Sequence, residues 1–117
     1  PPPHRMQIAR IRLHPLEVPM SRPIKMAGET LTHAHTLLAG ITDETGRTGW
    51  GEASAAPLMT GETLASLAAS TEYLASRLPG CRVDDADAIA PLLDGLLYAN
   101  PSAKSAFRAI PNSRTCT

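Results

Sequence analysis

Alternating apolar and polar positions predict strands in the first half of the chain. In residues 7–13 apolar side chains take one parity and basic side chains the other, as in a half-buried strand. Pro15 interrupts this register, which favours a bulge or bend before the pattern resumes through Val18. The near-continuous apolar run 37–41 indicates a second strand that is buried on both faces.

A glycine-rich stretch supplies the third strand. Gly46 can adopt the positive φ that closes a tight turn after Asp43. Gly49 and Gly51 flank Trp50, the single tryptophan, and leave room for backbone to approach the strand closely. We therefore expect strands at about 7–18, 33–43 and 47–54, joined in sequence as an antiparallel meander.

The period becomes helical after Thr60, which we expect to be an N-cap. Three- and four-residue steps predict a helix over about 60–78 that ends at Pro79-Gly80, and a second over about 85–98 behind Asp84-Asp85. Asn100-Pro101 signals a short third helix. The predicted fold class is α+β, a three-stranded antiparallel meander followed by a small helical bundle.

Composition narrows the function. The 117 residues suit one domain, and zero net charge gives no support for a nucleic-acid or membrane-surface partner. No apolar run reaches the roughly 20 residues of a membrane span. Two cysteines without a secretory signal favour reduced thiols and a cytoplasmic location. We expect residues 1–5 to be a disordered leader and 108–117 a disordered or aberrant tail.

No catalytic or metal constellation is evident from the residue pattern. His33 and His35 share one strand face, but nothing nearby completes a metal site around them. Glu29, Glu52 and Glu62 are candidate acid–base groups, although single carboxylates are mostly solvated surface charges. From these residues we predict no catalytic residue, no bound metal and no cofactor in the chain itself.

Several ordered motifs nevertheless resemble one enzyme family. They are Ile8-Ala9-Arg10-Ile11, Val18-Pro19-Met20, Arg22-Pro23, Gly46 with Gly49-Trp50-Gly51-Glu52-Ala53, Thr60-Gly61-Glu62-Thr63 and Asn100-Pro101-Ser102-Ala103-Lys104-Ser105-Ala106. Each is weak alone, but their order and spacing over about residues 6–107 resemble the N-terminal part of enolase-superfamily enzymes. The likeness is to the muconate-lactonizing and mandelate-racemase type, with dipeptide epimerases nearest and muconate cycloisomerases next.

The resemblance implies that residues 6–107 form a capping domain over a β/α barrel. In that family the barrel supplies a Lys-x-Lys pair, three acidic Mg²⁺ ligands and a further base, and together these remove a proton α to a carboxylate. The present sequence contains no Lys-x-Lys and no barrel, for which about 200 residues or more are needed. We expect a chain truncated before its barrel, by a frameshift or another cause. The implied partners are a dipeptide or other carboxylic acid, the missing barrel and further copies of the chain.

Two cap segments are implied to close over the active-site mouth, one around residues 20–31 and one around 55–60. Their candidate substrate-binding residues are Met20, Ile24, Met26, Glu29, Leu58 and Met59. The apolar members either contact substrate or simply pack, and Glu29 either attracts a cationic substrate end or is solvated. The competing hypothesis is a stand-alone, cap-like binding or interaction module without catalytic activity, which the DNA downstream of the reading frame would distinguish.

Overall fold

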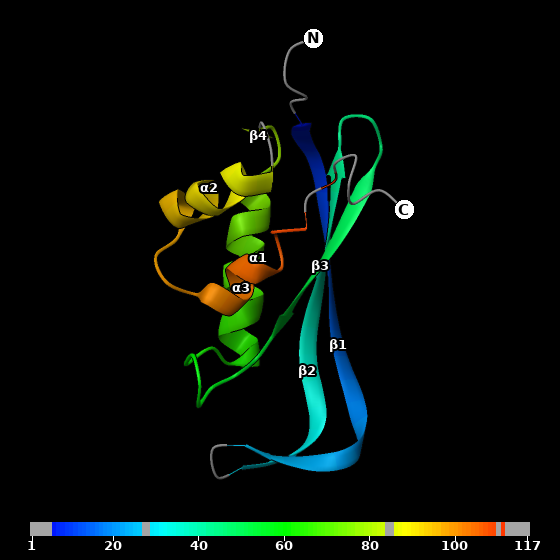
Figure 1. Ribbon diagram of the computed structural model, residues 1–117, viewed down its shortest axis with the longest axis vertical. Coiled ribbons are helices and arrows are strands. Elements are labelled where there is room, and N and C mark those ends of the chain that lie inside the picture. The colour runs from blue at the N-terminus through cyan, green and yellow to red at the C-terminus, as the bar shows by residue number, and fades with distance from the viewer. Residues whose placement is uncertain (1–5, 27–28, 84–85, 110, 112–117) are drawn as a thin grey trace.

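The computed structural model describes residues 6–26, 29–83, 86–109 and 111. Their elements, in chain order, are β1 (Met6–Met26), β2 (Glu29–Asp43), β3 (Thr48–Ser54), α1 (Leu64–Arg77), β4 (Arg82–Val83), the 3₁₀ helix η1 (Ala86–Ala88), α2 (Ile89–Leu96) and α3 (Pro101–Ser105). The helices gather on one face of a twisted antiparallel sheet, and the β1–β2 hairpin extends beyond them as a long arm (Figure 1). The α+β class is confirmed.

The sheet has four strands in the order β3-β2-β1-β4, so the expected three-stranded meander lacked one strand. β4 pairs with Met6 and Gln7 through only two residues, which is too short to leave an alternating pattern in the sequence. The expected bulge at Pro15 was wrong. Pro15 lies in regular register opposite Leu37, where an edge strand tolerates its missing N–H, and the irregularities lie elsewhere.

The strands expected at about 7–18 and 33–43 were too short, since β1 continues through residues 19–26 and β2 begins at Glu29. The ladder between β1 and β2 continues to the pair Met26 and Glu29, after a register shift between Pro19 and Ile24. Pro19 and Pro23 suggested that the strand ends before them. The hairpin nevertheless continues, because the irregularity in its register accommodates both prolines. Residues 20–26 and 29–31 therefore belong to the end of a hairpin arm.

Helix ends differ from those expected. Thr63, not Thr60, is the N-cap of α1, in a reciprocal capping box with Ser66. Pro91 lies in the first turn of α2, where a missing N–H is tolerated. Asn100 precedes Pro101 as expected, but its left-handed backbone (φ 54°) prevents side-chain capping, which needs an extended residue. None of the described helices is long and apolar enough to cross a membrane.

The core lies between the sheet and the helices. Its fully buried side chains come from the strands, α1, α2 and the end of α3, and include Phe107, Ile8, Ile41, Leu67, Leu74, Leu78, Ile89 and Leu93. Thr71 is buried among them because its hydroxyl donates to the carbonyls of its own helix. The expected tail 108–117 is largely outside the described residues, but Pro111 is described and is buried.

Helix α3 covers the outer edge of β3. The Ser102 hydroxyl donates to the Ser54 carbonyl at 2.6 Å and accepts from the Ser54 amide at 3.2 Å. Ser105 donates to the Glu52 carbonyl at 3.2 Å. Gly51 makes this approach possible, since a Cβ there would lie 2.0 Å from the Ala106 carbonyl oxygen. The predicted close approach beside Trp50 is confirmed, and the serines satisfy backbone groups that an edge strand leaves open.

The turn between β2 and β3 is held by a buried carboxylate. Asp43 accepts hydrogen bonds from the amides of Thr45 and Arg47, from the Thr45 hydroxyl and from Arg47 Nε, while Gly46 adopts φ +93° as expected. Burial alone would raise the pKa of Asp43, but these hydrogen bonds outweigh it and lower the pKa below its usual value.

We expect Asp43→Asn to destabilise the chain by about 2 kcal/mol, because several donors lose a charged acceptor. A folded pKa below the unfolded one means that the carboxylate stabilises the fold above about pH 4 and that this contribution disappears as the pH falls through the folded pKa. Urea titrations between about pH 3 and 7 measure both effects. Glu72→Gln, on the exposed face of α1, is the control. Identical pH profiles for Asp43→Asn and the unmodified chain would contradict this role.

Candidate functional site

Two segments lie at the end of the molecule opposite Met6 (Figure 1). One is the end of the β1–β2 arm, and the other is the turn between β3 and α1. Met20, Ile24 and Met26 lie on β1, and Glu29 is the first residue of β2. The side chains of these four residues are outside the described part of the structure, so their proposed contacts remain predictions.

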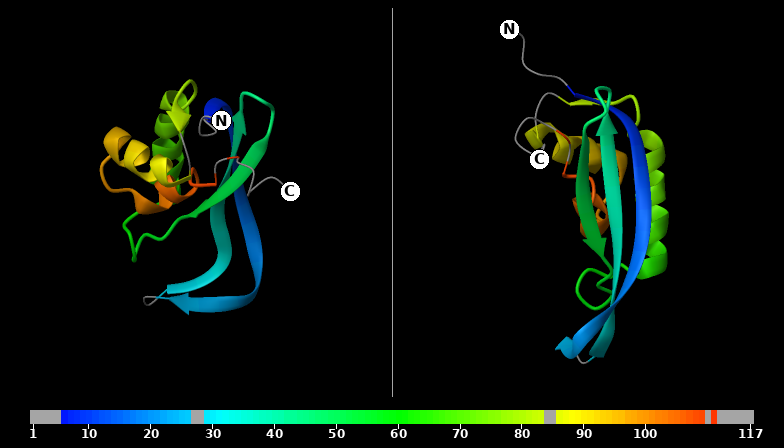
Figure 2. Two further views of the ribbon diagram at one scale, coloured as in Figure 1. Left: turned by 45° about the horizontal axis from the view of Figure 1, so that its top comes forward. Right: turned by 90° about the vertical axis from the view of Figure 1, so that its right-hand side faces the viewer.

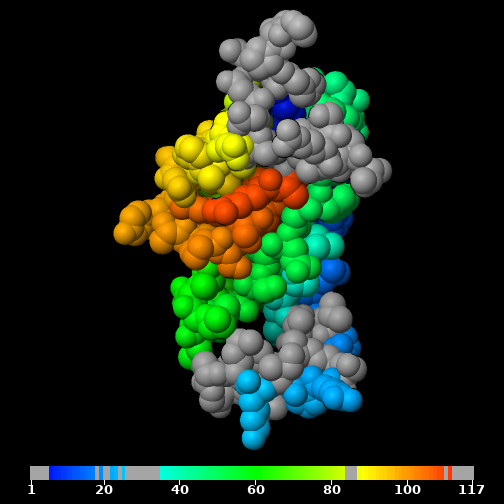
Figure 3. Space-filling model, in the orientation of Figure 1, coloured from blue at the N-terminus to red at the C-terminus, as the bar shows by residue number. Residues whose placement is uncertain are grey.

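The turn at residues 55–62 is tightly held. Ala55 donates its amide to the His35 carbonyl, and Ala56 and Glu62 form an isolated antiparallel bridge. The amides of Met59 and Thr60 both donate to the Ala56 carbonyl, at 3.1 and 2.9 Å. Figure 3 shows this segment in green at the surface beneath the helices. The backbone of this turn is thus held by hydrogen bonds within it and to β2.

Leu58 and Met59 project from this turn into solvent. Their side chains are 56% and 68% exposed. Neither packs in the core of the described chain, and both interpretations, contact with a substrate and ordinary packing, stay predictions. Two adjacent exposed apolar side chains on an ordered turn are available for contact with another surface or a ligand.

Glu62 anchors the turn to α3. Only 4% of the residue is exposed, and its two carboxylate oxygens accept the amides of Ser102 and Ala103, each at 3.0 Å. These amides belong to the first turn of α3 and have no partner within the helix. Glu62 is therefore not the solvated surface charge that single carboxylates usually are, and its two hydrogen bonds to backbone amides give it a structural role. In the sequence, the one hint of this contact was that a carboxylate at Glu62 and a helix start at Pro101 both occur, about forty residues apart.

The other candidate polar groups are not brought together. Glu52 is exposed on the sheet, the side chains of Glu29 and His33 are not described, and His35 Nδ1 is buried without a hydrogen-bond partner among the described atoms. Within residues 6–26, 29–83, 86–109 and 111, no three His, Cys, Asp or Glu side chains gather as a metal site would require.

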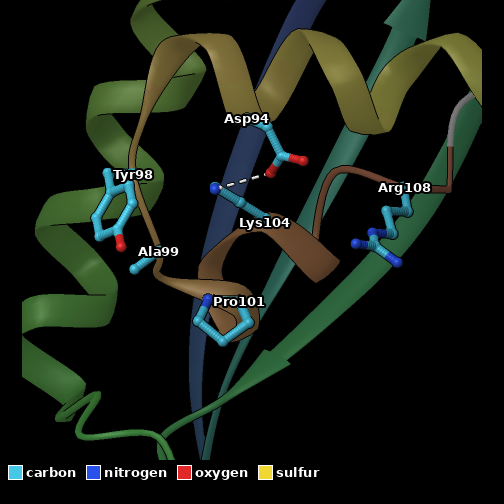
Figure 4. Close-up of a pocket in the computed structure, with 6 residues that line it drawn as sticks. All are labelled: Asp94, Tyr98, Ala99, Pro101, Lys104 and Arg108. Atoms are coloured by element: carbon cyan, nitrogen blue, oxygen red, sulfur yellow. Dashed lines mark hydrogen bonds and ion pairs between the residues drawn. The ribbon is translucent and has the colours of Figure 1, made fainter.

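A groove of about 570 Å³ between α2 and α3 was not anticipated from the sequence. Its lining residues are Asp94, Tyr98, Ala99, Pro101, Lys104 and Arg108 (Figure 4). Lys104 Nζ lies 2.9 Å from Asp94 Oδ1, and the lysine side chain is only 8% exposed. One of the two lysines in the chain is thus committed to an ion pair, which ties α3 to α2. The sequence feature that could have indicated this ion pair is Lys104, the one charged residue among the small residues of α3.

Comparison with known proteins finds relatives that match most of this chain. The family model for the mandelate racemase / muconate lactonizing enzyme N-terminal domain matches residues 9–109. The L-Ala-D/L-Glu epimerase of Bacillus subtilis is 33% identical over 102 residues, 86% of this chain and 28% of the relative. The D-Ala-D/L-Ala epimerase of Cytophaga hutchinsonii is 34% identical over 104 residues, 87% of this chain and 28% of the relative. The chain therefore spans less than a third of the curated relatives that it matches.

Solved structures agree with these matches. The substrate-liganded B. subtilis L-Ala-D/L-Glu epimerase has a TM-score of 0.79 at 32% identity, over 90% of this chain and 30% of that one. The C. hutchinsonii dipeptide epimerase, complexed with Mg and D-Ala-L-Val, has a TM-score of 0.77 at 30% identity, over 88% and 28%. A dipeptide epimerase from Methylococcus capsulatus, complexed with Mg and L-Arg-D-Lys, has a TM-score of 0.71 at 29% identity, over 84% and 28%.

We expect Glu62→Gln to destabilise the chain by about 1–3 kcal/mol, because one of the two helix amides loses its acceptor and the other loses a charged one. The free energy of unfolding in urea measures the loss. Glu72→Gln is the matched control, since it removes the same charge from an exposed position on α1. A Glu62→Gln chain as stable as the control would show that the carboxylate does not hold α3.

Proposed function

Because the chain belongs to the mandelate racemase / muconate lactonizing enzyme family, matching its N-terminal domain, we propose that residues 6–107 are the substrate-specificity cap of a Mg²⁺-dependent isomerase. The reaction is removal of the proton α to a carboxylate. Dipeptide epimerisation is the first activity to test, since both curated relatives above are epimerases named for dipeptides. Muconate cycloisomerisation is the second.

The observation that supports this proposal most is the exposed pair Leu58 and Met59 on a hydrogen-bonded turn. Covering these two side chains removes apolar surface from water, which is favourable by roughly 25 cal/mol per Å² buried. In the complete enzyme they close against the active-site mouth and exclude water from it. Glu62 holds the turn in place by its bonds to α3.

The Mg²⁺ of the proposed enzyme does not belong to this domain. The described residues do not fit a metal site, since no cluster of three ligating side chains is present among them. The metal and the acid–base groups are assigned to the barrel that this cap is proposed to cover, and the whole enzyme to the cytoplasm as a homo-oligomer.

Specificity in this proposal comes from the arm. Met20, Ile24 and Met26 contact the substrate side chains, and Glu29 faces a cationic end. A carboxylate withdrawn from water distinguishes a basic from a neutral partner strongly, because an unpaired buried charge is costly. The M. capsulatus relative was complexed with L-Arg-D-Lys, so a basic dipeptide is bound by at least one similar protein.

The isolated chain should be catalytically silent. Its only lysines are Lys25 and Lys104, so it contains no Lys-x-Lys pair, and Lys104 is bound to Asp94. We expect no exchange of the α-proton of L-Ala-L-Glu in D₂O with Mg²⁺ above a protein-free background, measured by NMR. The B. subtilis relative is the positive control. Exchange catalysed by the pure chain would remove the division of labour proposed between cap and barrel.

Grafting tests the cap itself. Residues 6–107 should replace the cap of the B. subtilis relative and retain dipeptide epimerisation. In that chimera we expect Glu29→Gln to lower the preference in kcat/KM for L-Ala-L-Lys over L-Ala-L-Ala by about tenfold, the equivalent of about 1.4 kcal/mol. Glu17→Gln, an exposed position on the shaft of the arm, should leave the preference unchanged.

The outcomes separate the two levels of the proposal. An inactive but folded chimera would contradict the capping function. An active chimera with the same preference in both variants would retain the cap and remove Glu29 from the site.

A further inference from the structure

Among the described residues, no helix lies on one face of the sheet. Figure 2 (right) looks onto this open face, with the helices behind it. Side chains alternate across a sheet, so the register assigns four rows to this face. Running from β1 through β2 to β3, they are Arg10/Thr42/Thr48, Arg12/Gly40/Trp50, His14/Leu38/Glu52 and Leu16/Thr36/Ser54.

An aromatic group lies at the centre of the open face. Trp50 is 54% exposed although its ring covers Gly40, where a Cβ would come within 2.8 Å of two ring carbons. The His14 ring lies beside it, with centroids 5.7 Å apart. Because Gly40 has no side chain, the indole packs against the backbone of β2. The opposite face of the ring is exposed and can contact a partner. Exposed aromatic surface of this kind is enriched at protein interfaces.

Charges on the open face are divided between its two sides. Arg10, Arg12 and His14 are exposed on β1, while Glu52 is exposed on β3. A partner that fits must present an aromatic ring or a carboxylate to the β1 side and a cation to the β3 side. The open face of a second copy has this distribution.

We propose that the open face binds the open face of a second copy of this chain about a two-fold axis parallel to the strands. Such an axis keeps the rows level and lays β1 over the partner's β3. Arg12 then lies level with Trp50 of the partner subunit, beside the ring that extends over the central strand, and His14 donates a hydrogen bond to Glu52 of the partner subunit. Each contact occurs twice, as two-fold symmetry requires.

The alternative axis, across the strands, is much less complementary. It would set Arg12 against the partner's His14 and Trp50 against the partner's Glu52. Packed sheets cross at about 30°, which offsets the outer rows but leaves the two central rows opposed. Complementarity of charge therefore selects the parallel axis. The inference concerns this chain by itself and does not depend on the proposed function.

The size of the face predicts a weak dimer. Three strands at about 4.8 Å and seven residues at about 3.3 Å give roughly 300–400 Å² of flat area. A standard interface buries about 800 Å² from each partner, so the dimer should dissociate in the micromolar range or above. Sedimentation equilibrium of the 117-residue chain should show a monomer–dimer equilibrium between about 5 and 500 μM.

Two charge reversals test the geometry. Glu52→Lys places a cation opposite the partner's His14, and His14→Glu places a carboxylate opposite the partner's Glu52, so each variant alone should dimerise at least tenfold more weakly. An equimolar mixture should dimerise again. In the mixed dimer one native His14–Glu52 contact remains, and the introduced lysine meets the introduced glutamate. Glu72→Lys, on α1 away from the face, is the matched control and should leave dimerisation unchanged.

A measurement on the unmodified chain supports the test if a variant fails to fold, as circular dichroism would reveal. The emission of Trp50, the single tryptophan, should shift to the red on dilution through the dimer's dissociation range. A monomer at every concentration would overturn the proposal. So would a dimer with constant Trp50 emission, or folded variants that dimerise as the control does. Variants that weaken alone but do not recover when mixed would refute the parallel axis.

Discussion

The domain depends on one buried carboxylate at the junction between its two halves. Glu62 follows the last strand of the meander and precedes the first long helix, yet its oxygens bind the amides of Ser102 and Ala103. A buried carboxylate is costly unless hydrogen bonds and a favourable dipole compensate for it, and the first turn of a helix supplies both. The turn at residues 55–62 and α3 are therefore positioned as a unit.

With α3 held in this way, the rest of the packing follows. Its serine hydroxyls occupy the outer edge of β3, and its backbone lies so close to the strand that Gly51 has no space for a side chain. Phe107, directly after this helix, enters the core beneath the sheet. Lys104 bonds to Asp94 and ties the same helix to α2. A five-residue helix thus connects the sheet, the turn at residues 55–62 and α2.

Local patterns predicted what depends on local physics. Alternation identified β1, a continuous apolar run identified β2 and a glycine-rich stretch identified β3 and the tight turn at Gly46, while three- and four-residue steps identified α1. The errors arose where distant contacts decide. A two-residue strand is stabilised only by its neighbour β1, prolines are accommodated by a hairpin that continues past them, and Glu62 has a partner forty residues away. The exposure of Leu58 and Met59 could not be predicted, because the sequence alone does not distinguish a buried methionine from a projecting one.

The edge of β3 also sets an order of events in synthesis. Ser54 and Ser102 are separated by 48 positions, and Glu62 and Ala103 by 41. A ribosome adds roughly 5–20 residues per second, so several seconds pass between the appearance of the strand and that of the helix that covers it. During this interval β3 presents unpaired amides and carbonyls to any other nascent chain. The close fit that completes the native domain is therefore the last to form, and in a crowded cell the meander is exposed to mispairing until α3 emerges.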